Sequence, residues 1–345
     1  MQTKRSKERK EEKNPKGTTM PQNSIEAIRI GTSGWSYKEW EGVFYPNSKT
    51  PKLTFYSSIF NTVEIDSTFY ANPSRGLVIG WVQNTPKNFE FAVKIPRTIT
   101  HEKELDLRKG AEVDLLKFLD LVNPLHETEK LGPLLIQLPP SFDSQKIDKL
   151  EEFLEALPTK SEKTYKFSVE FRNKSWLEED EKKEMISLLR KYNVTNTIVD
   201  EPLMPIDLIP TCDFAFIRWH GHGKRPWYNY RYSEKELDLW VERVNKRKEK
   251  FKDVKKIYGY FNNHFHGYAV ENSLEFLTKL GIATENQKTI LPSVKDRIEA
   301  RLQEREYLPE EEAVSRRRAT TQSKGRDNNI EATVSKLDQK TLSEF

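Results

Sequence analysis

Ten side chains able to carry chemistry lie in or just after runs of sequence that alternate like β-strands. They are Glu64, Lys94, Gln137, Glu170, Arg172, Arg218, His220, Asn262, Tyr70 and Trp35. Glu64, Glu170 and His220 are the candidate catalytic residues, because two carboxylates beside a histidine can divide acid and base roles once their environments separate their pKa values. The set therefore predicts proton-transfer chemistry.

The other seven residues are candidates for ligand binding. They are Lys94, Gln137, Arg172, Arg218, Asn262, Tyr70 and Trp35. Three of them are cationic, and the planar guanidinium groups of Arg172 and Arg218 suit a carboxylate or a phosphate. The predicted ligand is a small anion that also carries hydroxyl groups. The alternative is that these charges neutralise one another as a polar plug, since structural ion-pair networks resemble active sites.

Two histidine pairs raise the alternative of a divalent metal. His220 and His222 follow one predicted strand, and His264 and His266 follow the next. Imidazoles together with carboxylates such as Asp200 are common metal ligands. Because the spacing of the pairs is loose, we expect no bound cofactor, with a metal held by His220 and His264 as the alternative.

Aromatic residues near the predicted strand ends can stack on a sugar or a base. The candidates are Trp35, Tyr37, Tyr70, Trp176, Trp219, Trp227 and Tyr228. Aromatic side chains more often pack in the interior, and we expect Trp176 and Trp219 to face the core.

The run Tyr165–Trp176 indicates which elements position these side chains. Apolar and polar residues alternate along it, so that Glu170 and Arg172 share one face of an extended strand near its end. Several other strand-like runs also end in a polar or charged residue. This recurrence predicts a parallel barrel whose strand ends build one site.

The whole chain follows the same alternation of strand and helix. Strands are predicted at 28–33, 62–70, 89–95, 134–138, 165–171, 194–199, 214–219 and 257–261. Helices are predicted at 48–60, 77–82, 111–122, 147–157, 181–192, 233–250 and 267–280. We read eight strand-then-helix units, which predict a single α/β domain with the (β/α)8 barrel of the TIM type. A doubly wound open sheet is the runner-up, but no Gly-x-Gly-x-x-Gly follows the first strand.

Composition limits the remaining possibilities. The single Cys212 excludes an internal disulfide and a cysteine-rich metal site in this chain of 345 residues. The basic start lacks the apolar core of a signal peptide, and no run is long and apolar enough to span a membrane. We therefore expect a cytoplasmic protein with no membrane partner.

Charge is concentrated at the start of the chain. Residues 1–24 hold seven basic and three acidic residues, which accounts for the formal net charge of +4. We expect a disordered tail there, either solvated or serving as an arm that binds nucleic acid. The barrel domain is placed at 25–282, and its balanced charge gives no electrostatic attraction to nucleic acid. Residues 283–345 are expected to form a charged, largely disordered tail, in which 294–306 can form a short solvated helix.

Seven motifs occur in order along the predicted barrel. They are Ile28–Trp35, Thr62–Tyr70, Phe91–Lys94, Gly132–Pro140, Val169–Arg172, Arg218–Gly221 and Phe261–Asn263. With these motifs the sequence resembles the YecE-like family, also called domain of unknown function 72, over roughly residues 25–280. The resemblance implies a TIM-type barrel and no particular activity. Asp66 departs from the family pattern, where asparagine is more usual, and it adds a negative charge to the predicted site.

Three classes of function remain open. We favour an enzyme with hydrolase- or isomerase-like chemistry that acts on a small anionic, hydroxylated ligand, because the predicted site holds cations inside a neutral body. The first alternative is a metal-dependent phosphodiesterase or nuclease that recruits nucleic acid through the tails, by analogy with other barrels. The second is a non-catalytic ligand-binding module.

Overall fold

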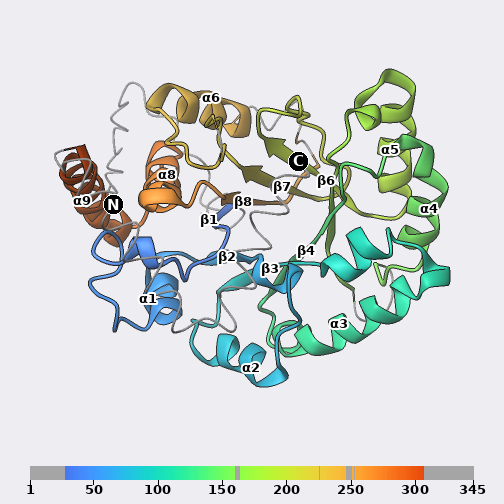
Figure 1. Ribbon diagram of the computed structural model, residues 1–345, viewed down its shortest axis with the longest axis horizontal. Coiled ribbons are helices and arrows are strands. Elements are labelled where there is room, and N and C mark those ends of the chain that lie inside the picture. The colour runs from blue at the N-terminus through green and yellow to red at the C-terminus, as the bar shows by residue number, and fades with distance from the viewer. Residues whose placement is uncertain (1–27, 160–163, 225, 246–250, 252, 307–345) are drawn as a thin grey trace, which may run out of the picture.

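The computed structural model describes residues 28–159, 164–224, 226–245, 251 and 253–306. In this part of the chain, eight parallel strands form a nearly closed barrel (Figure 1). They are β1 (Ile28–Thr32), β2 (Thr62–Ile65), β3 (Glu90–Lys94), β4 (Leu131–Gln137), β5 (Phe167–Glu170), β6 (Thr195–Asp200), β7 (Phe214–Trp219) and β8 (Lys256–Phe261). The strands pair in sequence order from β2 to β8, and β8 also pairs with β1. The predicted TIM-type barrel is confirmed.

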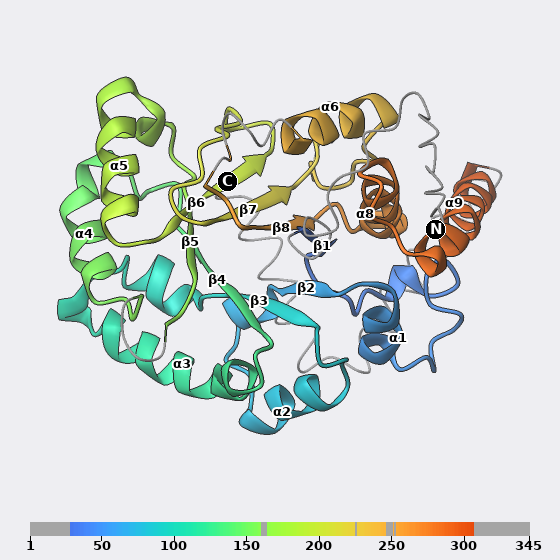
Figure 2. The same ribbon diagram turned by 180° about the vertical axis from the view of Figure 1, so that it is seen from behind.

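Helices surround the strands in both views of the molecule (Figure 2). They are α1 (Lys52–Ile59), α2 (Arg75–Gln83), α3 (Ala111–Glu127), α4 (Ile147–Glu155), α5 (Glu179–Lys191), α6 (Glu234–Asn245), α8 (Tyr268–Lys279) and α9 (Glu285–Glu306). The seven predicted helices left one of the eight strand-then-helix units, after the sixth strand, without a helix, and the structure agrees. Residues 201–213, which join β6 to β7, are all described and contain no helix.

The barrel closes between β1 and β2 through a short contact. Ser33 forms an isolated parallel bridge with Glu64, and the amide of Gly34 donates a hydrogen bond to the Glu64 carbonyl at 2.8 Å. Gly34 has a φ of 77°, a left-handed conformation that glycine adopts without steric cost. The turn after β1 therefore joins the two edges of the barrel beside a candidate site residue.

Side chains of alternate strand residues fill the barrel. One buried apolar cluster consists of Ala92, Leu135, Phe214, Phe216, Tyr258 and Tyr260. Two residues beyond the last cluster member of each strand come Lys94, Gln137, Arg218 and Asn262. Because side chains alternate with period two, these four polar residues point to the same side as the cluster. The barrel interior therefore changes from apolar to polar towards the C-terminal ends of the strands.

The second strand ends earlier than the predicted 62–70. After Ile65 the chain turns into a short 3-10 helix at Ser67–Phe69. The hydroxyl of Thr68 donates to the carbonyl of Lys94 at 2.7 Å, which ties this turn to the end of β3. The turn carries Tyr70 over the end of the barrel instead of extending the strand.

Helix α9 corrects the predicted domain boundary at 282. Val294 and Ile298, one helical turn apart, are buried, and the side chain of Gln287 donates to the carbonyl of Ile59 at 2.6 Å. Arg301 donates to the carbonyl of Glu41 at 2.6 Å. Residues 285–306 thus belong to the folded domain. The expectations for residues 1–24 and for 307–345 fall outside the described residues.

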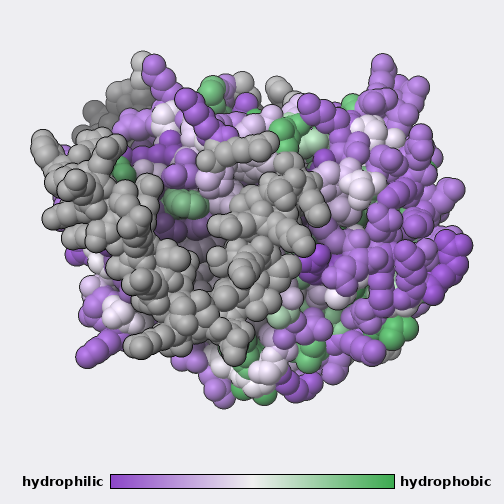
Figure 3. Space-filling model, viewed as in Figure 1, coloured by the Kyte–Doolittle hydropathy of each residue, from purple (hydrophilic) through white to green (hydrophobic). Residues whose placement is uncertain are grey.

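The outer surface is consistent with the high share of charged residues. The described face beside α4 and α5 is almost entirely hydrophilic (Figure 3). Among the described helices, none combines the length and the apolar character needed to cross a membrane. Trp176 and Trp219 are fully buried, as predicted.

Candidate functional site

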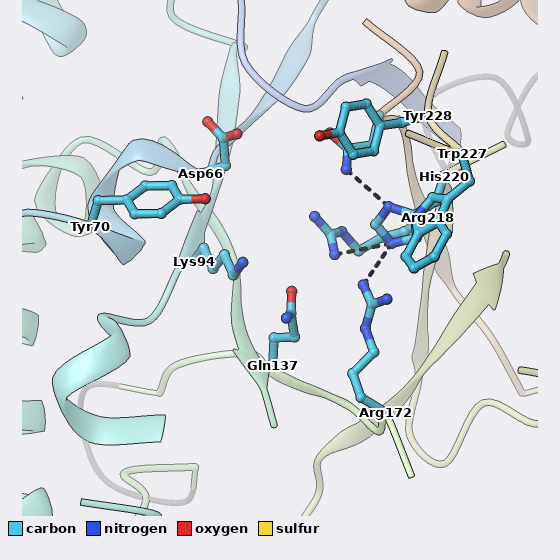
Figure 4. A pocket seen from close by; sticks show the side chains of 10 residues that line it. Asp66, Tyr70, Lys94, Gln137, Arg172, Arg218, His220, Trp227 and Tyr228 are labelled. Carbon is cyan, nitrogen blue, oxygen red and sulfur yellow. Dashed lines mark hydrogen bonds between the residues drawn. The ribbon is translucent and has the colours of Figure 1, made fainter. Parts of the chain in front are cut away.

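A pocket of about 150 Å³ opens at the C-terminal ends of the strands (Figure 4). It is lined by Asp66, Tyr70, Lys94, Gln137, Arg172, Arg218, His220, Trp227, Tyr228 and Asn262. Seven of the ten residues predicted for the site are in this lining. The volume is room for about five water molecules, so the pocket suits a small ligand.

The carboxylates of Glu64 and Glu170 do not line the pocket. They are fully buried and paired with Arg218. Nε and Nη2 of Arg218 donate to the two carboxylate oxygens of Glu64 at 2.9 and 2.7 Å, and Nη1 donates to Glu170 at 2.7 Å. One guanidinium from β7 therefore links carboxylates from β2 and β5 across the barrel.

Arg172 forms a second set of ion pairs beside the first. Its Nε donates to Glu170 at 2.6 Å, and its Nη1 is bonded to the carboxylate of Glu201. Glu201 directly follows β6 and was missed in the sequence, where Asp200 was taken as the end of that strand. Period-two alternation places Asp200 and Glu201 on opposite faces of the strand. Asp200 faces outwards and accepts a hydrogen bond at 2.7 Å from the indole of Trp240, which lies on helix α6.

The charges around Glu170 determine its protonation state. Burial alone would raise the pKa of this carboxyl, but the guanidiniums of Arg172 and Arg218 outweigh burial and hold the pKa far below its usual range. Glu170 is therefore ionised and a weak base at neutral pH. Burial raises the pKa of Glu201, against the opposing effect of Arg172.

His220 is surrounded by donors. Its Nε2 lies 3.1 Å from Nη2 of Arg172 and 3.3 Å from Nη1 of Arg218, and its Nδ1 lies 2.9 Å from the side-chain amide of Asn262. Burial, and then the two guanidiniums, lower the pKa of His220 well below its usual value. The ring is therefore neutral, and its Nε2 lone pair can accept from the guanidinium N–H groups.

Lys94 and Asp66 line the pocket, and each has a pKa shifted towards neutral pH. Lys94 is 8% exposed, and its Nζ lies 3.8 Å from the centre of the Phe69 ring. Burial, then Arg218, lower the pKa of Lys94 to about 7, although Glu170, Glu64 and Asp66 oppose the shift. Burial and the charge of Glu64 raise the pKa of Asp66. Lys94 can therefore change protonation state near neutral pH, and the pKa of Asp66 is shifted upwards from its usual value.

The predicted aromatic residues divide between pocket and core. Tyr70, Trp227 and Tyr228 line the pocket. Trp35 does not: its ring packs edge-on against Trp81 and Phe91, with centroid distances of 6.2 and 6.4 Å. Trp35 lies three residues after the end of β1, and the turn at Gly34 directs it towards α2, so its place in the sequence was misleading.

The geometry does not support a metal held by His220 and His264. His220 faces guanidinium groups, while the His264 ring is stacked on Tyr37 at 4.4 Å and has its pKa lowered to about 4 by burial. His222 is bonded to Asp200 at 2.6 Å, on the outer side of the strand. Within the described residues, no three or more His, Cys, Asp or Glu side chains are grouped so as to hold a metal ion.

Comparison with known proteins supports this fold. A model of the family described as "Protein of unknown function DUF72" matches residues 29–296. The UPF0759 protein YunF of Bacillus subtilis is 28% identical over 282 residues, which are 74% of this chain and 95% of YunF. The UPF0759 protein YecE of Escherichia coli K12 is 28% identical over 174 residues, which are 50% of this chain and 59% of YecE.

Two solved structures have the same fold. A DUF72 family protein of Thermotoga maritima is 33% identical, with a TM-score of 0.63 over 74% of this chain and 99% of that chain. A DUF72 family protein of Enterococcus faecalis is 25% identical, with a TM-score of 0.65 over 75% of this chain and 97% of that chain. Because the family model matches well over half of the sequence and these relatives share the barrel, the protein belongs to the family of proteins of unknown function DUF72.

Proposed function

We propose that this protein is an enzyme acting on a small hydroxylated ligand that carries a phosphate or carboxylate group. The observation that carries the proposal is the sign of the charges in the pocket. Three cationic side chains, Lys94, Arg172 and Arg218, line it, and Asp66 is the one carboxyl among the described lining residues. Glu64 and Glu170, which balance the arginines, lie outside the lining. The pocket lining therefore presents guanidinium and amine groups, with a single carboxyl among the described lining residues, to its contents.

The walls of the pocket suggest how the ligand is oriented. His220, Trp227 and Tyr228 lie on one side, and Tyr70, Asp66 and Lys94 on the other (Figure 4). The aromatic rings offer faces for a carbon skeleton, as aromatic platforms do for sugars. The side-chain amides of Gln137 and Asn262 can bond hydroxyl groups. Arg172 and Arg218 are held in place by their carboxylates, which makes them preorganised donors for an anionic group.

The geometry favours a division of roles different from the one predicted. Glu64 and Glu170 fit positioning residues, because their carboxylates accept hydrogen bonds from Arg218 and Arg172 and neither lines the pocket. His220 fits a neutral hydrogen-bonding group in the wall. We therefore assign proton transfer to Asp66 and Lys94, because both line the pocket and burial raises the pKa of Asp66 and lowers that of Lys94 to about 7.

Calorimetry can test the binding half of the proposal. Inorganic phosphate and glycerol 3-phosphate are titrated into the full chain at low ionic strength, with glycerol as the uncharged control. We expect both phosphates to bind and glycerol to bind at least about tenfold more weakly. Lys94→Gln should weaken phosphate binding by a similar factor, while Lys87→Gln, at an exposed site outside the pocket, should not. Equal affinity for glycerol and glycerol 3-phosphate would contradict an anion site.

Turnover tests the catalytic half. Small phosphorylated and carboxylated polyols are incubated with the protein, and conversion is followed by proton NMR. We expect a substrate whose conversion is lost in Asp66→Asn while its binding persists. Binding without conversion of any compound would favour the non-catalytic ligand-binding module. No observation on the described residues favours the metal-dependent nuclease, because a cluster of metal ligands is lacking among them.

A further inference from the structure

Two buried lysines of this barrel have opposite surroundings. Lys130 is 5% exposed, and its amine donates to the carbonyls of Val82 and Thr85, both at 2.7 Å, and to the Thr85 hydroxyl at 2.9 Å. All three of its N–H groups are used. Lys94 is 8% exposed, yet among the described residues its amine has no hydrogen-bond acceptor and no carboxylate within ion-pair distance. The amine lies over the face of the Phe69 ring, 3.8 Å from its centre.

The Lys94 amine reaches the pocket, so water or a ligand can bond it where no protein group among the described residues does. The carboxylates of Glu64 and Glu170, which lie near enough to act on Lys94 electrostatically, are already bonded to Arg218 and Arg172. Lys94 lines the pocket, and its side chain projects into it (Figure 4). The partner of this amine is therefore supplied by whatever enters the pocket.

We propose that Lys94 is a nucleophile that forms an imine with a carbonyl group of the ligand. The inference rests on the proposed function and narrows it, since the ligand must then carry an aldehyde or ketone as well as an anionic group. Lysines become nucleophilic in this way when they are desolvated or placed next to another cation. Lys94 meets both conditions, because it is buried and lies close to Arg218.

The step balances without an oxidant or a reductant. The lone pair of Nζ forms a bond to the carbonyl carbon, and the electron pair of the C=O bond moves to oxygen, which takes up a proton. The resulting carbinolamine loses this hydroxyl with a second proton as one molecule of water, leaving a C=N bond to Lys94. Asp66 lines the same pocket and provides the carboxyl that carries protons to the oxygen and from the nitrogen.

The electrostatic surroundings keep part of the amine neutral at pH 7. The charged groups that act on Lys94 are Arg218 of β7, Glu170 of β5, Glu64 of β2 and Asp66 just after β2. Burial, and then Arg218, lower its pKa to about 7 against the opposing effect of the three carboxylates, so a large fraction of Lys94 is unprotonated there. An ordinary lysine, with a pKa of about 10.4, is unprotonated in roughly one molecule in 2,500 at this pH.

Reductive trapping tests the proposal on the full chain. The protein is incubated at pH 7 with dihydroxyacetone phosphate and sodium cyanoborohydride, which reduces an imine to a stable secondary amine, and the modified lysine is located by mass spectrometry. We expect labelling of Lys94 at least about tenfold faster than of Lys130 or of exposed lysines. Glycerol 3-phosphate, which has the anion but no carbonyl, should compete and slow the labelling.

Two variants complete the experiment. Lys94→Arg keeps the charge but has no nucleophilic amine, so it should bind glycerol 3-phosphate and show no pocket label. Lys130→Arg is the matched control and should label like the wild type. Glycerol 3-phosphate binding without a label on Lys94 would overturn the imine and leave the anion-binding function standing. If the protein neither binds glycerol 3-phosphate nor becomes labelled, both proposals are overturned. If the label is spread over exposed lysines and glycerol 3-phosphate does not slow it, the imine is overturned. Should Lys94→Arg fail to fold, wild-type competition alone decides between these outcomes.

Discussion

Replacing Arg218 by methionine should cost the protein a large part of its stability. Both carboxylate oxygens of Glu64 are bonded to Arg218, and the Glu64 side chain is fully buried, so Arg218→Met leaves it without its partner. Removing one member of a buried ion pair typically costs about 3–5 kcal/mol. Glu170 loses one donor but keeps Arg172, so most of the expected loss comes from Glu64.

The size of the loss should depend on pH, because the stranded carboxylate can take up a proton instead of staying charged. For a glutamate with the ordinary pKa of about 4.3, protonation at pH 7 costs about 3.7 kcal/mol, which agrees with the range above. In the variant the folded form then binds a proton that the unfolded form releases. Its free energy of unfolding should therefore fall by about 1.4 kcal/mol per unit as pH rises from about 5 to 7.

Urea unfolding at several pH values measures both effects. Arg218→Met with Glu64→Gln should recover much of the loss at pH 7, because no buried charge remains. Arg75→Met is the control: its pair with Asp120 is 3.7 Å long and exposed on both sides, so the change should be within about 1 kcal/mol. A loss of less than about 1 kcal/mol for Arg218→Met, independent of pH, would refute the reasoning.

Two further predictions concern Lys94 and α9. Because the pKa of Lys94 in the folded protein is about 7 and that of an unfolded lysine about 10.4, the unfolded state binds more protons between these values. Wild-type unfolding free energy should therefore rise with pH from about 7 to 10 relative to Lys94→Met, and parallel pH curves would contradict the shift. Ile298→Ala should cost about 2–5 kcal/mol. A chain ending at residue 306 should melt like the full chain and one ending at 282 should melt lower, whereas equal melting temperatures would show that α9 adds nothing.

The barrel and the direction of its polar side chains could be predicted because both depend on local periodicity. Alternation along Tyr165–Trp176 placed Glu170 and Arg172 on one face, and the structure joins them by a hydrogen bond. The same reasoning gathered Lys94 and Arg218 at one end of the barrel. These assignments need only the period-two rule and the parallel arrangement of strands.

The pairing of charges could not be predicted, because it depends on distances across the barrel. Arg218 meets Glu64 and Glu170, which are 154 and 48 residues away in the sequence. Any of the acidic residues at the strand ends was a candidate partner from sequence alone. Glu201 could have been found by continuing the alternation of β6 one residue beyond Asp200.

Helix α9 and Trp35 were misread for other reasons. The helix is rich in charged residues and was expected to be solvated. Its apolar residues nevertheless recur every four positions, at Ile290, Val294, Ile298 and Leu302, and pack on the core, so the signal for a docked helix was present in the sequence. The placement of Trp35 depends on the left-handed backbone at Gly34. A sequence read by periodicity alone does not show which way such a turn directs the next side chain.

The pairing of charges explains why two of the three predicted catalytic residues, Glu64 and Glu170, do not line the pocket. Glu64 and Glu170 do not line the pocket, and their negative charges are neutralised by ion pairs with Arg218 and Arg172. The arginines can therefore face a ligand as fixed donors without carrying uncompensated charge into the barrel. Lys94 has no such carboxylate of its own, so its charge is the part of the site that a ligand can change. Chemistry at this site is thus expected at the group that the network leaves unpaired, and the strongly paired groups hold it in place.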